Sequence, residues 1–346
     1  MGVTFTGTKD RKDLAEIQEY IYQDALTLQD GIIDVQSGFK SGANVYESKA
    51  AVTMKAGTSA AVTADGSIAL TVERTPVALT LIEYSDTVDE ESLKGTRFEE
   101  SMAPGAINNI SDEFDKKVLA QVIPAIGEDV DAKIWNGATT ATKAAIAALT
   151  PGAGQGSISA GAQALVAAMP TTLFDSIPVR MLYNDSLSKA VPGAGLGDYV
   201  KVGGTTVTAA NIDAEYAKIY AAIPSKLMQK TSLPKYIFAP LGDLQLIVAA
   251  NKLATVSQQM PFLVENPGTP TQRITYNGVE VKFYPLVDFR IAGLAKHLKL
   301  LNDFSGDLSS LEIDKMANGA KARYIKNQQM MTTWVTNQPF NVLYNG

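Results

Sequence analysis

The most constraining feature of this sequence is a long β-hairpin pattern over residues 49–80 that contains few bulky apolar side chains. Asp65-Gly66 within it favours a tight turn, because both residues tolerate positive φ. A hairpin rich in Ala and Thr buries little surface by itself. It is therefore either an ordinary hairpin over the core of its own chain or an arm that packs on a neighbouring subunit. Its apolar residues mostly alternate with small or polar ones, as in strands: Val52, Met54, Val62, Ile68, Leu70, Val72, Val77 and Leu79.

A long amphipathic helix is predicted over residues 104–135. Pro104 suits the first turn, and Pro124 predicts a kink or break because proline removes a backbone donor. A helix of roughly 30 residues spans about 45 Å, which is long for a compact domain. Its apolar stripe recurs at spacings of three and four: Ile107, Ile110, Phe114, Val118, Val122 and Ile126, continuing through Val130, Ile134 and Trp135.

The remaining segments indicate an α+β protein. An N-terminal helix is predicted over 14–28, and the Ala-, Thr-, Gly- and Ser-rich stretch 137–161 is predicted to connect two lobes. The second lobe is predicted to contain a helix at 162–169, a strand at 177–182, a hairpin at 199–208 around Gly203-Gly204, a helix at 212–227, a strand at 236–239, a helix opened by Pro240 and a hairpin at 274–283 around Asn277-Gly278. The C-terminal region is predicted to contain strands at 298–301, 311–313 and 323–335. An apolar group at 340–344 is predicted to dock on the body.

Composition excludes several classes of function. The 346 residues are 46% hydrophobic and 19% charged, enough to bury the core of one large domain or two ordinary ones. A net charge of −6 argues against direct nucleic-acid recognition, although a protein that merely surrounds nucleic acid needs no basic patch. The chain has no cysteine, which excludes disulfides and thiolate chemistry. Residues 1–10 lack the apolar core of a signal peptide, and no apolar stretch is long enough to span a membrane.

Few residues offer familiar catalytic chemistry. The single histidine, His297, lies between Lys296 and Lys299 without a GxSxG or HExxH motif, so a surface or interface histidine is the favoured interpretation. Glycines at 193, 195 and 197 lack a preceding βα pattern and indicate a loop. No catalytic, cofactor-binding or metal-binding residue is predicted. One acidic cluster could form a carboxylate pair or a magnesium site, but a helix start and a solvated loop would place these residues there anyway, and a solvated face is the favoured interpretation: Asp86, Asp89, Glu90, Glu91, Glu99 and Glu100.

The order of segments resembles a known family. An N-terminal arm, a long hairpin, a strand at 77–84, a long helix, an αβ lobe and returning strands make the chain similar to the Hong Kong 97-type fold of tailed-phage major capsid proteins and bacterial encapsulins. Local phrases also resemble these proteins: Phe98-Glu99-Glu100, Phe114-Asp115 and Lys235–Pro240. The resemblance implies an N-terminal arm at 1–48, an extended hairpin called the E-loop at 49–80, a P-domain at 81–140 and 295–346 with a spine helix at 104–135, and an A-domain at 141–294.

The resemblance also implies a function. A major capsid protein forms the hexamers and pentamers of an icosahedral head that encloses double-stranded DNA without sequence-specific binding. The implied partners are other copies, a separate scaffolding protein and a portal, with no membrane; the implied location is the virion, after assembly in the host bacterial cytoplasm. The expected intersubunit contacts on the hairpin are Lys55, Asp65, Gly66, Glu73 and Arg74.

Three other functions stay open at this point. An encapsulin-like compartment would have the same fold but an enzyme cargo. Another phage structural protein, such as a tail component, would form tubes or rings. A soluble enzyme with an unrecognised carboxylate site would be a monomer or small oligomer with a deep pocket.

Overall fold

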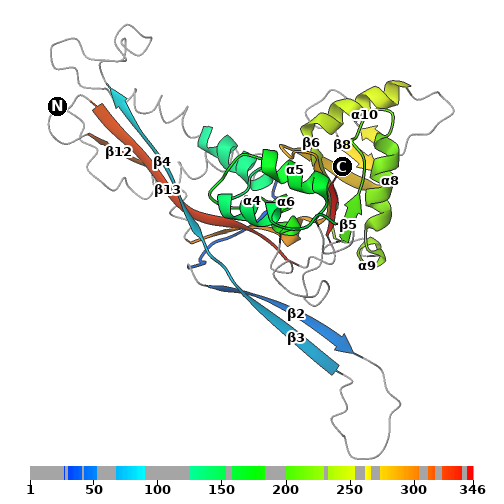
Figure 1. The fold of residues 1–346 in the computed structure, drawn as a ribbon, viewed down its shortest axis with the longest axis horizontal. Coiled ribbons are helices and arrows are strands. Elements are labelled where there is room, and N and C mark those ends of the chain that lie inside the picture. The colour runs from blue at the N-terminus through cyan, green and yellow to red at the C-terminus, as the bar shows by residue number, and fades with distance from the viewer. Residues whose placement is uncertain are drawn as a thin grey trace, which may run out of the picture.

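A computed structural model describes residues 27, 30–40, 43–52, 68–89, 125–152, 158–183, 200–229, 233–253, 262–265, 273–303, 311–315, 322–336 and 341–345. These residues form two mixed sheets, helices packed around them and one separate two-stranded hairpin (Figure 1). The α+β class predicted from the sequence is therefore confirmed. The predicted N-terminal helix lies outside the described residues except for Thr27.

The first sheet has five strands arranged around β13, the longest described strand. On one side of β13, residues Ala322–Met331 pair antiparallel with β4; on the other side, β12 and then β11 pair with successive parts of it. The strand β1 adds to β11 in parallel. The C-terminal strands predicted from alternation are confirmed. The bounds are β1 (Asp34–Gln36), β4 (Thr80–Asp89), β11 (Leu298–Asn302), β12 (Leu311–Lys315) and β13 (Ala322–Val335).

The second sheet has seven strands in the order β5-β14-β10-β6-β9-β8-β7. Asn277 and Gly278 have φ of 46° and 81°, so the predicted β8–β9 hairpin closes through a turn that needs positive φ at both positions. The C-terminal strand β14 lies buried between β10 and β5, so the last apolar group docks on the body as predicted. The bounds are β5 (Val200–Gly203), β6 (Lys235–Pro240), β7 (Phe262–Glu265), β8 (Arg273–Tyr276), β9 (Val279–Tyr284), β10 (Phe289–Leu294) and β14 (Val342–Asn345).

Helices cover the two faces of the seven-stranded sheet unequally. On one face, α8 (Ile212–Ala222) and α10 (Leu241–Leu253) enclose an apolar core with Ile237, Val281 and Ala292 of the sheet. The predicted helix at 212–227 is divided, because Pro224 separates α8 from the short α9 (Ser225–Met228). On the other face, Phe238, Tyr284 and Ile291 belong to a second core that continues under the five-stranded sheet.

The end of the long predicted helix joins the two sheets. Residues 125–135 are helical, and the predicted stripe of Ile126, Val130, Ile134 and Trp135 is buried. Trp135 stacks on Tyr284, with ring centroids 4.9 Å apart, and its Nε1 donates to the hydroxyl of Thr27 at 2.8 Å. Residues 104–124, including the predicted kink at Pro124, lie outside the described residues.

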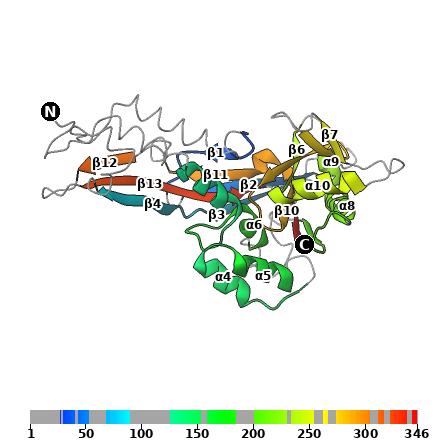
Figure 2. The ribbon, with the colours of Figure 1, turned by 90° about the horizontal axis from the view of Figure 1, so that it is seen from above.

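The predicted connection at 137–161 is wrong in its first and last parts. It contains α4 (Thr140–Ala147), whose N-terminus is capped by Thr139, and it runs into α5 (Ala160–Ala168), which confirms the helix predicted at 162–169. Alanine is the best helix former, and Ile146 supplies a buried anchor between the two helices. A composition typical of linkers therefore hid a helical pair that projects from one side of the molecule (Figure 2).

The strand predicted at 177–182 is a helix, α6 (Ile177–Leu182). Ser176 occupies the N-cap position and Pro178 lies in the first turn, where its missing N–H costs nothing. Five of the six side chains are buried, so the segment shows neither the period of a strand nor that of an amphipathic helix. A short buried helix of this kind is easily mistaken for a buried strand.

The hairpin predicted around Gly203-Gly204 is also wrong. β5 ends at Gly203 and pairs in parallel with β14, while residues 204–208 form no strand. A Cβ built on Gly204 would overlap the ring of Tyr344, so this glycine permits a close approach rather than a tight turn.

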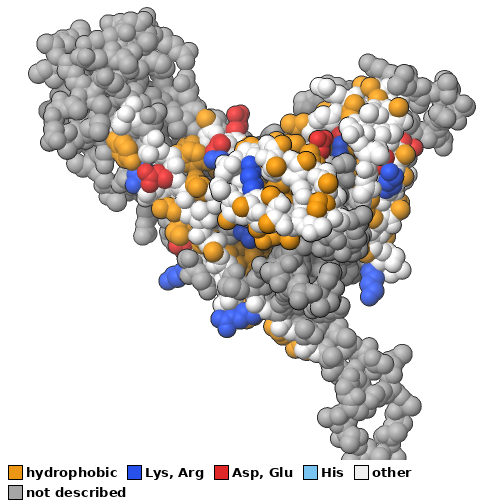
Figure 3. Space-filling model, viewed as in Figure 1, with side chains coloured by type: hydrophobic (Ala, Val, Ile, Leu, Met, Phe, Trp, Pro, Cys, Tyr) orange, Lys and Arg blue, Asp and Glu red, His pale blue; other side chains and the backbone are white. Residues whose placement is uncertain are grey.

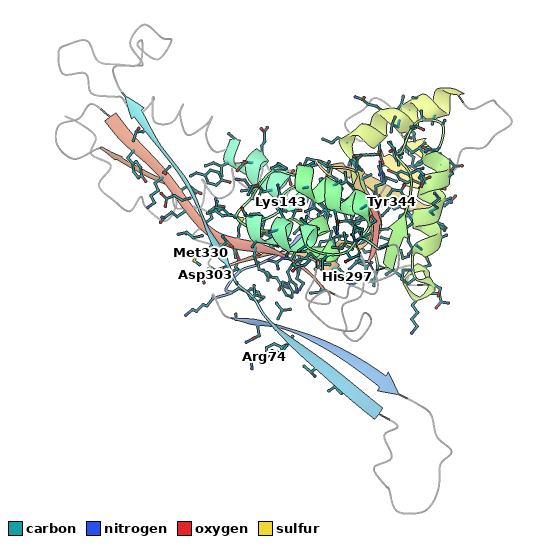
Figure 4. The ribbon with its side chains drawn as sticks, viewed as in Figure 1. Arg74, Lys143, His297, Asp303, Met330 and Tyr344 are labelled. Carbon is teal, nitrogen blue, oxygen red and sulfur yellow. The ribbon has the colours of Figure 1, made fainter. Side chains whose placement is uncertain are left out.

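His297 is buried, so the surface interpretation is wrong. It ends the short helix η3 (Ala295–His297), which carries the chain from β10 of one sheet to β11 of the other. Its Nδ1 lies 3.3 Å from Oδ1 of Asn341, and its carbonyl accepts from the backbone N–H of Thr336 at 2.9 Å. Thr336 directly follows β13 of the first sheet and Asn341 directly precedes β14 of the second, so His297 contacts residues next to strands of both sheets (Figure 4).

Candidate assembly interface

A two-stranded hairpin extends from the body and belongs to neither large sheet (Figure 1). β2 (Asn44–Val52) and β3 (Ile68–Pro76) pair antiparallel from Asn44–Pro76 to Val52–Ile68. Strands of this length reach about 30 Å at roughly 3.4 Å per residue. Isolated two-stranded hairpins are marginally stable in water, so the arm needs cover from elsewhere.

The root of the hairpin is firmly held by the five-stranded sheet. The backbone N–H of Val77 donates to the carbonyl of Ala43 at 2.8 Å, and that of Gly38 donates to Asp303 at 2.8 Å. Gly38 has a φ of 92°, which favours glycine where the chain turns toward β2. A small buried cluster formed by Val77, Leu79, Leu301 and Trp334 packs against Val45, Phe39 and Met330. Figure 4 shows Asp303 and Met330 at this root and Arg74 farther along β3.

Beyond the root, large apolar side chains of the hairpin are exposed. Tyr46 is 64% exposed, Leu70 is 67% exposed and Val72 is 55% exposed. Figure 3 shows hydrophobic side chains on the part of the hairpin that emerges from the body. Clustered exposed apolar side chains of this size mark interaction surfaces more often than scattered single ones do. The hairpin is therefore the strongest candidate interface in the described part of the chain.

The residues predicted as intersubunit contacts fall in different places. Arg74 is exposed on β3, directly opposite Tyr46 in the ladder, and Glu73 is its neighbour in the same strand. Lys55, Asp65 and Gly66 lie outside the described residues. The tight turn predicted at Asp65-Gly66 therefore also lies outside the described residues, which end at the Val52–Ile68 pair of the ladder.

Sequence reasoning missed Tyr46, which lies ahead of the predicted hairpin. The strand β2 begins at Asn44, in the segment assigned to the N-terminal arm. The alternation of Val45, Tyr46 and Glu47 was a usable signal, because a two-residue period indicates a strand. Asp86 and Asp89, predicted at a helix start, instead lie in β4.

The buried charges of the described chain hold the fold together. Asp243 of α10 accepts from the hydroxyl of Tyr216 of α8 at 2.7 Å and pairs with Arg290 of β10. Burial, and then the Asp243 carboxylate, raise the pKa of Tyr216 well above its usual value. Such a group stays protonated and acts as a hydrogen-bond donor rather than as an acid or base.

Within the ranges that the structure describes, no group of three or more His, Cys, Asp or Glu side chains could hold a metal ion. The helices of those ranges include none that is both long and apolar enough to cross a membrane.

Two mixed sheets that share a core with a buried helix end, together with an anchored two-stranded arm, define the α+β class of this fold. No protein-family model and no curated protein matches the chain. Solved structures do match it over nearly its whole length.

The capsid of a native GTA particle matches with a TM-score of 0.54 at 9% identity, covering 99% of this chain and 93% of that one. The capsid of Cyanophage A-1(L) matches with a TM-score of 0.53 at 10% identity, covering 93% and 92%. The procapsid of satellite phage P4 matches with a TM-score of 0.50 at 10% identity, covering 99% and 93%. The chain has the phage capsid fold, as the order of its segments predicted.

Proposed function

We propose that the chain is a major capsid protein, the subunit of an icosahedral shell built from hexamers and pentamers. The observation that carries this proposal is the extended hairpin, whose Tyr46, Leu70 and Val72 are exposed in the single chain. The likeness of the fold to phage capsids supports it.

The arm favours assembly because the single chain leaves the apolar side chains of the arm exposed to water. Burying apolar surface stabilises an association by roughly 25 cal/mol per Å². A specific interface removes about 1,200–2,000 Å² from water, and an extended arm adds contact area with little added mass. Repetition of one arm contact around a ring closes it without a second partner.

We assign the parts as the resemblance implies. The resemblance places the N-terminal arm at residues 1–48, the E-loop hairpin at 49–80, the P-domain at 81–140 and 295–346 with the spine helix 104–135, and the A-domain at 141–294. Because the paired strands run from Asn44 to Pro76, we extend the E-loop to begin at Asn44. The contacts between subunits that the resemblance implies are Lys55, Asp65, Gly66, Glu73 and Arg74. The function is structural, with no catalytic step.

The net charge of the chain and its proposed role as a shell subunit indicate what the shell encloses and which proteins assist its assembly. A chain with a net charge of −6 encloses double-stranded DNA by confinement and counterions, without sequence-specific contacts. Assembly uses a separate scaffolding protein and a portal, takes place in the host bacterial cytoplasm and places the chain in the virion.

Negative-stain microscopy of the expressed chain, alone and with neighbouring virion proteins, tests the proposal. The expected result is closed shells of uniform size that protect DNA from nuclease when the packaging proteins are present. A stable monomer in every condition contradicts the proposal. Tubes or rings would indicate another structural role, and shells that contain an enzyme would indicate a compartment of the encapsulin type.

A further inference from the structure

The two faces of the hairpin differ in chemistry. In an antiparallel ladder, directly opposed residues share a face, and successive residues alternate between faces. The register pairs Arg74 with Tyr46, Val72 with Ser48 and Leu70 with Ala50, so even-numbered positions form one face. Because Ser48 and Ala50 are small, we expect their partners Val72 and Leu70, together with the Tyr46–Arg74 pair, to make most of the contacts of this face. The odd positions carry a mostly polar sequence: Glu47, Lys49, Thr71, Glu73 and Thr75.

The body of the chain contacts the odd face of the hairpin at its root. At the root, Val45 packs against the buried cluster of the body and is half-buried. The next residue, Tyr46, belongs to the other face and is 64% exposed. The body therefore lies beside the odd face at the root and leaves the apolar even face uncovered.

Arg74 adds a positive charge to the even face of the hairpin. It is exposed beside Tyr46, and the described part of the chain gives it no ion pair. Tyrosine and arginine, like tryptophan, are enriched among the few residues that carry most of the binding energy of interfaces. A second copy suits this cation, because the chain has 36 acidic and 30 basic residues and is acidic as a whole.

We propose that the even face of the hairpin, with Tyr46, Leu70, Val72 and Arg74, docks on a second copy of this chain, while the odd face stays in water. The inference rests on the proposed function and deepens it, since it separates two residues that the resemblance treats alike. Arg74 lies at the interface, whereas Glu73 lies on the solvent side.

The absence of cysteine makes a direct test possible. The variants Leu70→Cys and Val72→Cys place a single thiol on the even face, and Thr71→Cys and Thr75→Cys are matched controls on the odd face of the same strand. Each variant is mixed with excess unmodified subunits so that particles still form. Labelling with a bulky maleimide is then compared between particles and dissociated subunits.

The expected result is that thiols at positions 70 and 72 react in free subunits and lose most of their reactivity in particles, while those at 71 and 75 react in both. Protection of 71 and 75 instead, or equal reactivity of both faces in particles, overturns the inference while the capsid function stands. Protection of 70 and 72 already in free subunits shows that the chain covers its own arm and also overturns it. If unmodified chains form no particles, the proposed function fails and the inference fails with it.

Discussion

Arg290 and Asp243 form a two-point ion pair in the interior of the lobe that contains the seven-stranded sheet. Nε of Arg290 lies 2.7 Å from Oδ2 of Asp243, and Nη2 lies 2.7 Å from Oδ1. Each side chain is 3% exposed. The guanidinium also lies 5.4 Å from the ring centroid of Tyr344, and Tyr216 donates to the same carboxylate. One carboxylate therefore links α8, α10 and β10, while the guanidinium reaches β14.

Removing one partner of this pair is expected to destabilise the subunit strongly. Asp243→Ala leaves the Arg290 charge buried and unpaired, which costs about 3–5 kcal/mol. Urea unfolding of unassembled subunits measures the loss. The control is Glu280→Ala, which removes the partner of the exposed Arg273 and should have a small effect. Equal losses in the two variants would show that the buried pair has no special role.

Two adjacent glycines provide a test of close packing. A Cβ on Gly204 would overlap Tyr344, whose hydroxyl is held by Glu215 at 2.7 Å, whereas a Cβ on Gly203 meets nothing within 4 Å. Gly204→Ala should therefore lower the free energy of unfolding by about 1–3 kcal/mol, the usual cost of overpacking. Gly203→Ala should leave it nearly unchanged. A chemical denaturation series on both variants checks this, and the opposite ranking would refute the packing argument.

These glycines also show where sequence reasoning succeeded and where it did not. Asn277-Gly278 and Gly203-Gly204 are equally good turn pairs, yet only the first closes a hairpin. The first is flanked by strands that are adjacent in sequence, so local information is sufficient. The second is determined by β14, more than a hundred residues away in the chain, which no local pattern reveals.

The same distinction between local and distant information explains the other outcomes. The stripe from Ile126 to Trp135 was predictable because its period is local. α6 was missed because contact with β13 and β14 buries nearly all of it and removes the period. The arm was predictable from its scarcity of large residues, but the exposure of Tyr46 required the register of the ladder.

A buried carboxyl predicts an unusual pH dependence. Burial is the largest cause that raises the pKa of Asp131; the hydroxyl of Thr27 opposes it, and Asp30 adds to it. The folded state therefore binds this proton more tightly than the unfolded state. The resulting contribution to stability is present at low pH and is lost as the pH rises from the unfolded pKa through the higher folded one.

Asp131→Asn keeps an oxygen that can accept from Thr27 but does not ionise. The variant should therefore gain stability relative to the unmodified chain as the pH rises above the ordinary range for Asp. Urea unfolding of both proteins at several pH values between about 4 and 8 gives this difference, since carboxyl groups titrate near the lower limit. A difference that stays constant with pH would contradict the raised pKa.

The arm should be required for assembly and dispensable for the fold of the subunit. Val72→Asp puts a charge on the even face of the hairpin, where Val72 is 55% exposed in the single chain. The charge costs little in water, so melting of unassembled subunits should change little. In an assembled interface it would be desolvated without a partner, which costs several kcal/mol at each copy. We therefore expect Val72→Asp to abolish shells in sedimentation and microscopy, while Thr71→Asp, one residue away on the odd face, still assembles.

Shells formed by Val72→Asp at the normal yield would show that this face is not buried between subunits. A large drop in the melting temperature of the free subunit would show that the arm is covered by its own chain.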